Sequence, residues 1–269
     1  MHIQSLDAAG IPIEGAIASG FIVNEGKDRF LYTCWHVVTG FDPFDIRIPP
    51  VIEARPALSK VKLRVSLQRA TINEPGAITI GGSQSWTVPL YDRDARPRSP
   101  LWYQDKDAKE NADLSNYGLR VPRWNDIVKI RLPPTETVSD IQLVDHSSFF
   151  PNIPRLGEKV HIVGYPFGYS AGGDEQPTPV VLSRNIASTR VGNSSFRCLL
   201  DGPGTEGMSG GPIFMEYSGK LVLLGLYTGV IFPDYKRHTN EKVTALGVCS
   251  LVSHCRLCPL EPYPPSANR

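Results

Sequence analysis

Residues 206–212 read Glu-Gly-Met-Ser-Gly-Gly-Pro, and no other stretch of this 269-residue chain says as much about its fold and chemistry. A serine that attacks a substrate needs its hydroxyl exposed on a tight turn, with backbone N–H groups aimed where the oxyanion forms. Gly207 has no Cβ, so its peptide can turn an N–H inward. The stretch therefore predicts Ser209 as a nucleophile, with the N–H groups of Gly207 and Ser209 as the oxyanion hole. The alternative is a glycine-rich turn that carries an ordinary serine.

A nucleophilic serine needs a general base, and the chain contains six histidines. His36 is the best candidate, because it follows the strand-like stretch Arg29–Trp35 (RFLYTCW) and a strand end projects its side chains toward a cleft. His161 alternates within another predicted strand, and we expect a structural role for it. The alternative for His36 is a half-buried histidine whose ring is satisfied by its neighbours.

The base in turn needs a carboxylate that fixes its tautomer and stabilises the imidazolium. Asp126 is the best candidate, because it precedes the apolar strand-like stretch Ile127–Leu132 (IVKIRL). An acid at this place lies at the buried mouth of a barrel rather than in solvent. The alternative is an ordinary aspartate at the start of a strand.

Short strand-like segments recur along the whole chain between turn residues. Val61–Leu67 (VKLRVSL) alternates strictly between apolar and polar residues, as a half-buried strand does. The chain has 24 glycines and 24 prolines, which disfavours long helices. We therefore expect an all-β protein with about a dozen short strands in sandwiches or barrels and no βαβ alternation.

The chain is expected to divide into two β units near residue 150. The first unit covers residues 1–150, the second covers 151–260, and 261–269 (EPYPPSANR) form a loose tail. Residues 91–120 differ from the rest, because 12 of these 30 residues are charged. We expect a solvated surface insertion there, with a short polar helix near Asp105–Asn116 and a possible role in binding a regulatory protein.

The order His36, Asp126, Ser209 resembles that of the chymotrypsin-like serine proteases, and the local strings resemble their Deg/HtrA-type trypsin-like branch most closely. Five strings carry this resemblance: Ser19–Val23 (SGFIV), Tyr32–Val38 (YTCWHVV), Asn125–Ile130 (NDIVKI), Gly164–Gly168 (GYPFG) and Leu224–Thr228 (LGLYT). In the last of these, the family uses a serine or threonine to support the catalytic acid.

This resemblance implies two six-stranded antiparallel β-barrels with the active site in the cleft between them. His36 and Asp126 would come from the first barrel and Ser209 from the second. The implied activity is that of a serine endopeptidase, which hydrolyses peptide bonds through an acyl-enzyme intermediate and needs no cofactor. The partners are then peptide or protein substrates.

Two features depart from the secreted members of that family. Met208 stands where those enzymes carry an aspartate that pairs with a freshly cut N-terminus. We therefore expect no zymogen cleavage and some other contact that controls the oxyanion loop. We also expect no C-terminal peptide-binding module of the Deg type.

The first substrate pocket is predicted to have two walls, and neither carries an acid at the floor position that trypsin-like enzymes use to bind lysine or arginine. Small or medium apolar substrate side chains are therefore expected. The predicted wall residues are Pro203, Gly204, Thr205 and Glu206 on one side and Thr228, Gly229 and Val230 on the other.

The composition argues against several classes of partner. The formal net charge of +1 gives no electrostatic reason to bind nucleic acid or an anionic membrane. No apolar run approaches the roughly 18 residues that span a bilayer, and the first ten residues, MHIQSLDAAG, lack the pattern of a secretory signal. The five cysteines form no regular framework, so we expect free thiols and a cytoplasmic location.

A metal site at the C-terminal cysteines is left open. Cys249, Cys255 and Cys258, with His254, are residue types that bind zinc. Cys249 falls within a predicted strand, and the neighbours His254 and Cys255 can hardly both turn to one ion. Free structural thiols and no metal are therefore favoured.

Other functions were weighed against the protease. Residues 207–211 also fit the G-x-S-x-G elbow of α/β-hydrolase esterases, but that fold needs an acid and then a histidine after the serine, on a parallel sheet with helices. The stronger alternative is a catalytically silent protease fold that serves as a binding or scaffold module. The presence of all three triad residues favours the enzyme.

Overall fold

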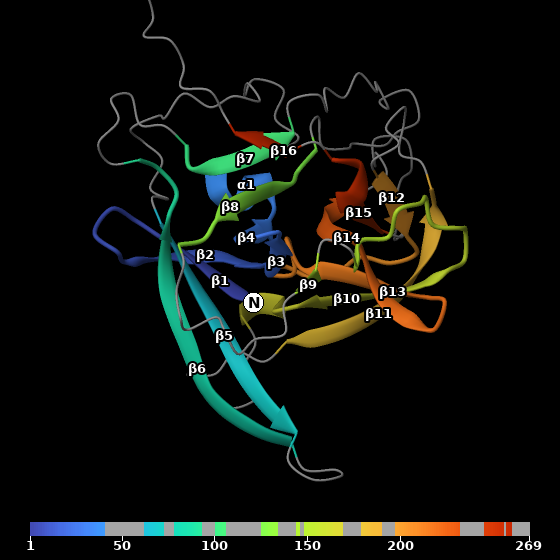
Figure 1. The fold of residues 1–269 in the computed structure, drawn as a ribbon, viewed down its shortest axis with the longest axis horizontal. Helices are drawn as coiled ribbons and strands as arrows, with labels where there is room; N and C mark the ends of the chain where they lie inside the picture. The colour runs from blue at the N-terminus through green and yellow to red at the C-terminus, as the bar shows by residue number, and fades with distance from the viewer. Residues whose placement is uncertain are drawn as a thin grey trace, which may run out of the picture.

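The computed structural model describes residues 1–40, 62–72, 78–92, 100–105, 125–133, 144–145, 148–168, 179–189, 197–231, 245–255 and 257–259. Three β-sheets account for most of these residues, and α-helix is limited among them to the short α1 (Trp35–Thr39). The all-β prediction is therefore confirmed (Figure 1). In the described part of the chain, no helix has the length and apolar composition that crossing a membrane requires.

Six antiparallel strands of the C-terminal half close into a barrel, so that each strand has a hydrogen-bonded neighbour on both sides. In barrel order the strands are β10 (Lys159–Gly164), β11 (Val180–Ser188), β12 (Arg197–Leu200), β15 (Leu246–Leu251), β14 (Lys220–Ile231) and β13 (Pro212–Tyr217). Alternate residues of β10 point inward, where Val160 and Ile162 pack with Ile213 and Leu224 in a dry core. One of the two expected six-stranded barrels is thus found.

The N-terminal half is built from two sheets. The first is antiparallel, in the order β2 (Pro12–Ser19), β1 (His2–Leu6), β5 (Lys62–Ile72) and β6 (Ile78–Pro89). The second has the order β16 (Leu257–Pro259), β7 (Trp102–Asp105), β8 (Val128–Arg131), β4 (Asp28–Thr33), β3 (Phe21–Glu25) and β9 (Val144–Asp145). Among the described residues these sheets do not close, so the expected first barrel is not found.

Unequal strand lengths account for the open first sheet. β5 pairs with β1 only over Lys62–Ser66, because β1 has five residues and β5 has eleven. From there β5 and β6 continue together as a two-stranded ribbon that curves away from the body (Figure 1). Closure into a barrel requires every strand to find two neighbours along its length, and the far part of this ribbon has one.

The structure describes only part of the expected surface insertion at 91–120. Residues 102–105 form β7 inside the second sheet, and the Trp102 side chain is 1% exposed. Local charge therefore does not keep this segment in solvent, because the apolar run Leu101–Tyr103 supplies a core residue. The expected helix at 105–116 and the tail at 261–269 fall almost wholly outside the described residues.

The two halves meet along a short stretch of main chain and a shared core. Only Gly20 separates β2, in the first sheet, from β3, in the second. Leu223 and Leu226 of the barrel strand β14 pack in the core cluster of the N-terminal half, and Phe150 N–H donates to Leu223 O (2.8 Å). The candidate site lies there.

Candidate active site

His36 and Asp126 are in direct contact at the top of the N-terminal half. His36 lies in the first turn of α1, directly after β4, and Asp126 lies two residues before β8. Because β8 pairs with β4 through Thr33 and Val128, the two residues lie side by side beyond this end of the pair. Sequence order and strand pairing together therefore bring the predicted base and acid to one place.

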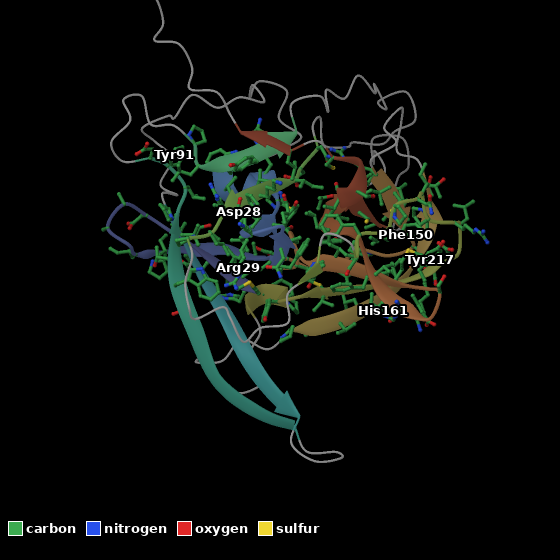
Figure 2. All side chains as sticks on the ribbon, in the orientation of Figure 1. Asp28, Arg29, Tyr91, Phe150, His161 and Tyr217 are labelled. Atoms are coloured by element: carbon green, nitrogen blue, oxygen red, sulfur yellow. The ribbon has the colours of Figure 1, made fainter. Side chains whose placement is uncertain are left out.

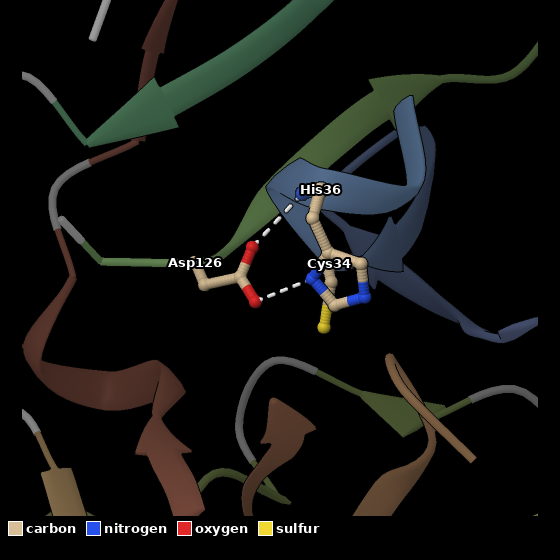
Figure 3. A group of neighbouring side chains, drawn as sticks. All are labelled: Cys34, His36 and Asp126. Carbon is tan, nitrogen blue, oxygen red and sulfur yellow. Dashed lines mark hydrogen bonds and ion pairs between the residues drawn. The ribbon is translucent and has the colours of Figure 1, made fainter. Parts of the chain in front are cut away.

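Two hydrogen bonds hold this pair. Asp126 Oδ1 accepts the backbone N–H of His36 (2.9 Å), and Oδ2 accepts the ring Nδ1–H (2.6 Å; Figure 3). The Asp126 side chain is fully buried, whereas that of His36 is 27% exposed. A carboxylate on Nδ1 places the other ring nitrogen, Nε2, in its proton-accepting form. The exposed edge of His36 can therefore take a proton.

The Ser209 turn precedes β13 and lies against the end of β10. Gly207 has φ +87°, and a Cβ there would lie 2.4 Å from Tyr165 O, so only glycine fits this position. Met208 is completely buried in the barrel core. The side chain before the predicted nucleophile thus anchors the turn by apolar packing.

The carbonyl groups of residues 206–209 all accept hydrogen bonds. Glu206 O accepts from Phe167 N–H (2.8 Å), and Met208 O accepts from Gly211 N–H (2.9 Å). Gly207 O and Ser209 O accept from the hydroxyl and the N–H of Ser19, each at 2.8 Å. In a planar trans peptide, the N–H points away from the carbonyl oxygen of the same unit. The Gly207 N–H shares its peptide unit with Glu206 O, and the Ser209 N–H shares its unit with Met208 O. Both N–H groups therefore point away from Phe167 and Gly211, and neither bonds any of the described residues.

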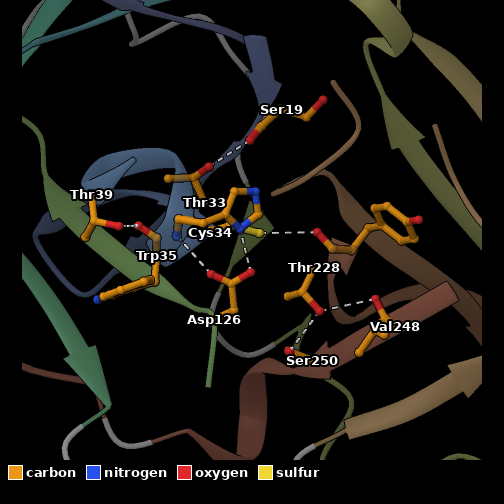
Figure 4. A network of polar contacts seen from close by, with 11 residues as sticks. Ser19, Thr33, Cys34, Trp35, Thr39, Asp126, Thr228, Val248 and Ser250 are labelled. Carbon is orange, nitrogen blue, oxygen red and sulfur yellow. Dashed lines mark hydrogen bonds and ion pairs between the residues drawn. The ribbon is translucent and has the colours of Figure 1, made fainter. Parts of the chain in front are cut away.

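Contacts across the junction bring the Ser209 turn next to α1. A Cβ on Gly210 would lie 3.1 Å from Thr33 Cα, and Gly210 N–H donates to Tyr227 O (2.7 Å). The Cys34 thiol donates to the same oxygen (3.4 Å; Figure 4). Gly210, the residue after Ser209, thus lies close to Thr33 and shares the acceptor Tyr227 O with Cys34. Thr33 and Cys34 come shortly before His36 in the chain. Among the described residues, no hydrogen bond joins the Ser209 hydroxyl to His36.

The family model of the trypsin-like peptidase domain matches residues 18–224, which is most of the chain and includes all three candidate residues. The chain belongs to the trypsin-like peptidase domain family. A search of curated proteins finds no match to it.

In this trypsin-like domain, the two predicted walls of the substrate pocket are tied to each other. Tyr227 OH accepts the N–H of Gly204 (2.8 Å), and a Cβ on Gly204 would lie 2.8 Å from the Tyr227 ring. Gly204 and Thr228 are buried, Pro203, Gly229 and Val230 are half-buried, and Thr205 and Glu206 are exposed. The ring of Tyr227 therefore occupies space beside the first wall.

The resemblance places Thr228 where the family uses a serine or threonine to support the catalytic acid. Among the described residues, however, Thr228 makes no hydrogen bond to Asp126. Its hydroxyl donates to Val248 O (3.4 Å) and accepts from Ser250 (3.4 Å; Figure 4). The thiol of Cys34 lies against the Asp126 carboxylate instead. Burial first, and then the nearby carboxylate, raise the pKa of Cys34 well above its usual value, so this thiol stays protonated and acts as a donor rather than a nucleophile.

Potential metal ligands gather at one place in the described part of the chain. One ligand atom each from Cys34, His36 and Asp126 lies within 4.8 Å of the other two. The 2.6 Å hydrogen bond between His36 and Asp126 leaves no room for an ion between those two atoms, since metal–ligand distances are about 2.0 Å. The arrangement therefore suits proton transfer better than metal binding.

The C-terminal cysteines and His161 have other surroundings. Cys249 is buried on β15, opposite Cys198 on β12, and Cys255 accepts a hydrogen bond from Asn125 Nδ2 (2.6 Å). The side chain of Cys258 lies outside the described residues. His161 lies on the outside of the barrel, where its Nδ1 contacts the Ser183 hydroxyl (3.0 Å; Figure 2).

Sequence reasoning missed three residues beside the site, which are Ser19, Cys34 and Tyr227. All three occur in the quoted strings Ser19–Val23, Tyr32–Val38 and Leu224–Thr228, but none was assigned a role. Their partners are distant along the chain, since Ser19 is 188 residues from Gly207 and Cys34 is 193 residues from Tyr227. The only local signal at Ser19 was a hydroxyl two residues before the apolar stretch Phe21–Val23.

Proposed function

We propose that this protein is a serine endopeptidase that uses Ser209 as nucleophile, His36 as general base and Asp126 as the orienting acid. The observation that carries the proposal is the buried Asp126 carboxylate. It binds both the main chain and the ring of His36, next to a turn whose Gly207 and Ser209 amides have no partner among the described residues. Family membership supports a protease fold of this kind. The strings around Ser19 and Gly164 suggest the Deg/HtrA-type branch.

The chemistry follows from these positions. The Ser209 hydroxyl attacks the substrate carbonyl and gives its proton to Nε2 of His36, while Asp126 stabilises the imidazolium. The oxyanion accepts hydrogen bonds from the N–H groups of Gly207 and Ser209. His36 then gives the proton to the leaving amine, and an acyl-enzyme on Ser209 remains. Water, activated by His36, hydrolyses this ester and restores the serine.

The proposed substrates are peptides or proteins with a small side chain before the cleaved bond. Tyr227 ties the two pocket walls together, and its ring fills space beside Gly204 that a large side chain would need. We expect a peptide library to be cleaved after alanine, glycine or serine in preference to phenylalanine or leucine. Fast cleavage after a large aromatic residue would contradict this specificity.

The decisive test uses a fluorophosphonate probe, which labels an activated serine. The wild-type protein should be labelled and should hydrolyse peptides, whereas Ser209→Ala should not be labelled. Loss of the nucleophile costs on the order of 10⁶ in kcat in enzymes of this mechanism. The free energy of unfolding should change by less than about 1–2 kcal/mol, because no hydrogen bond of the Ser209 hydroxyl to a described residue is lost.

A correctly folded wild-type protein that takes no label would favour the silent binding module instead. The observation that favours a binding module is the absence, among the described residues, of a hydrogen bond between the Ser209 hydroxyl and His36. The absence is compatible with an enzyme, because such contacts often tighten only when substrate binds. His36→Ala separates the two readings further, since it should abolish labelling in an enzyme and change nothing in a scaffold.

The proposal extends to the cellular location and the partners of the protein. The structure describes four of the five cysteine side chains, and all four are free thiols, three of them buried, which suits a reducing compartment such as the cytoplasm. No cofactor is required by the mechanism, and nucleic acid and membranes are not among the proposed partners. A regulatory protein that binds residues 91–120 stays a prediction.

A further inference from the structure

Ser19 connects the N-terminal half to the Ser209 turn through its N–H and its hydroxyl. It is completely buried at the end of β2. Its N–H donates to Ser209 O (2.8 Å), and its hydroxyl donates to Gly207 O (2.8 Å). The same hydroxyl accepts Tyr165 N–H (2.9 Å), and its carbonyl accepts the Thr33 hydroxyl (2.9 Å).

These bonds fix the two peptides that adjoin the Ser209 N–H unit, because Gly207 O belongs to the Gly207–Met208 peptide and Ser209 O belongs to the Ser209–Gly210 peptide. Four carbonyls, those of residues 206–209, set the orientation of the turn, and Ser19 binds two of them. Without the Ser19 hydroxyl, Gly207 O would lose its partner. Glycine at φ +87° has no side chain to resist rotation of the adjoining peptides. The Gly207–Met208 peptide, which links the units that carry the Gly207 and Ser209 N–H groups, would then be free to turn, and the two N–H groups would no longer be held at a fixed angle to each other.

We propose that Ser19 is the positioning residue that holds the oxyanion hole in its working form, in place of an ion pair made on activation. This inference rests on the proposed function. The buried side chain of Met208 anchors the turn in the barrel core, and the hydroxyl of Ser19 binds it from the N-terminal half. The hole is therefore built whenever the two halves are packed together, and no cleavage of the chain is needed to form it.

The test compares Ser19→Ala with Ser5→Ala. Ser5 is a serine of the neighbouring strand β1, 1% exposed, so the same atoms are removed from the same sheet. For Ser19→Ala, kcat should fall about 10- to 100-fold with little change in KM, a part of the 10²–10³ that loss of an oxyanion donor costs. Ser5→Ala should keep kcat within about twofold, as an ordinary buried substitution does.

A second measurement separates positioning from simple destabilisation. Affinity for a peptide boronate, which mimics the tetrahedral intermediate, should fall in Ser19→Ala by the same factor as kcat/KM. Affinity for the matching uncleaved peptide should not change. In addition, hydrogen exchange at Tyr165 N–H should speed up in Ser19→Ala and stay slow in Ser5→Ala, because only the first loses its acceptor.

Each outcome decides the question. A Ser19→Ala protein with wild-type kcat, or with equal losses of boronate and peptide affinity, would overturn the positioning role. Unchanged exchange at Tyr165 would overturn the hydrogen bond itself, even in a protein without activity. If Ser19→Ala does not fold, Ser19→Cys, which fills the space with a weaker donor, must show the same loss of kcat at constant KM. A wild-type protein that takes no fluorophosphonate label would instead refute the proposed function.

Discussion

The two halves of the molecule hold their part of the site in different ways. The C-terminal half is a closed barrel, in which every strand is paired on both sides and the Ser209 turn leads directly into β13. Among the described residues, the sheets of the N-terminal half are open, and the long ribbon β5–β6 leaves the body (Figure 1). A closed barrel fixes a turn through its backbone, whereas an open sheet fixes the ends of its strands less strictly.

The difference teaches why the N-terminal half relies on side chains. His36 is bound twice by one carboxylate, and Ser19 reaches across to the barrel with both hydroxyl bonds. On the barrel side, the Ser209 turn is held by the buried side chain of Met208 and by backbone hydrogen bonds of Gly210 and Gly211. Substitutions at three places test this difference: at the side chain that holds His36, at the junction of the two halves, and at the edge of that junction.

The largest effect is expected from Asp126→Asn, which disturbs support by a side chain. The amide can still accept the His36 N–H, but its NH₂ then faces Nδ1 and favours the tautomer that has its proton on Nε2. The rate of peptide hydrolysis should fall by about 10⁴. Kinetics with a peptide substrate check this, and fluorophosphonate labelling should slow in parallel.

Near-wild-type activity of Asp126→Asn would mean that another group orients His36. The thiol of Cys34 is the neighbour to examine in that case, because it lies against the same carboxylate. Cys34→Ala in the wild-type background is the matched control. It leaves both Asp126–His36 hydrogen bonds in place and should cost far less activity than Asp126→Asn.

The junction itself is tested by Gly210→Ala. A Cβ at this position would lie 2.2 Å from Ser19 O and 2.4 Å from the Thr33 hydroxyl oxygen, and the residue has φ +84°. The two halves would have to move apart, so the free energy of unfolding should fall by about 2–4 kcal/mol. Urea denaturation measures it, and peptidase activity should be lost as well.

Gly26→Ala provides the comparison for Gly210→Ala. Gly26 also has a positive φ, of +64°, but nothing lies within 4 Å of an added Cβ in the β3–β4 turn. Its substitution should cost only about 1 kcal/mol from backbone strain. If the free energy of unfolding falls equally in the two variants, backbone strain accounts for the whole effect, and the halves are not tightly packed at Gly210.

The sequence indicated the candidate residues of the site but not the contacts that support them. Gly207, Ser209, His36 and Asp126 could be named because glycines, strand ends and chain order are local features of the sequence. The contact between Ser19 and Gly207 joins residues 188 positions apart, and no short-range pattern encodes such a pairing. The family resemblance placed Ser19 in a strand without assigning its hydroxyl a partner.

The fold was predictable in class and only partly in architecture. Alternation such as that of residues 61–67 predicts a strand, but it does not say how far the neighbouring strand accompanies it. The short β1 beside the long β5 therefore made closure of the first barrel unpredictable. Likewise, average charge over 91–120 concealed Trp102, because burial is decided by one side chain and its neighbours rather than by composition.

The smallest effect is expected at His2, where the first sheet touches the barrel. The ring of His2 packs edge-on against Tyr165 (5.6 Å between centroids), and its Nε2 is buried without a hydrogen-bond partner among the described residues. Burial, and then the positive amino terminus, lower the pKa of His2 from 6.5 to about 4. The folded protein therefore keeps this histidine neutral at a pH where the unfolded chain protonates it.

The sign of the pH dependence follows from that difference. Between about pH 6.5 and about pH 4 the unfolded chain binds a proton at His2 that the folded protein does not, so the free energy of unfolding falls as the pH is lowered through this range. Below about pH 4 both states are protonated, and His2 adds no further loss. His2→Phe keeps an aromatic ring against Tyr165 and removes the titration. Urea denaturation from pH 7.5 to 4.5 should therefore show the wild type losing stability relative to His2→Phe. A constant difference between the two proteins over this range would mean that His2 is solvated and that the halves are open at this edge.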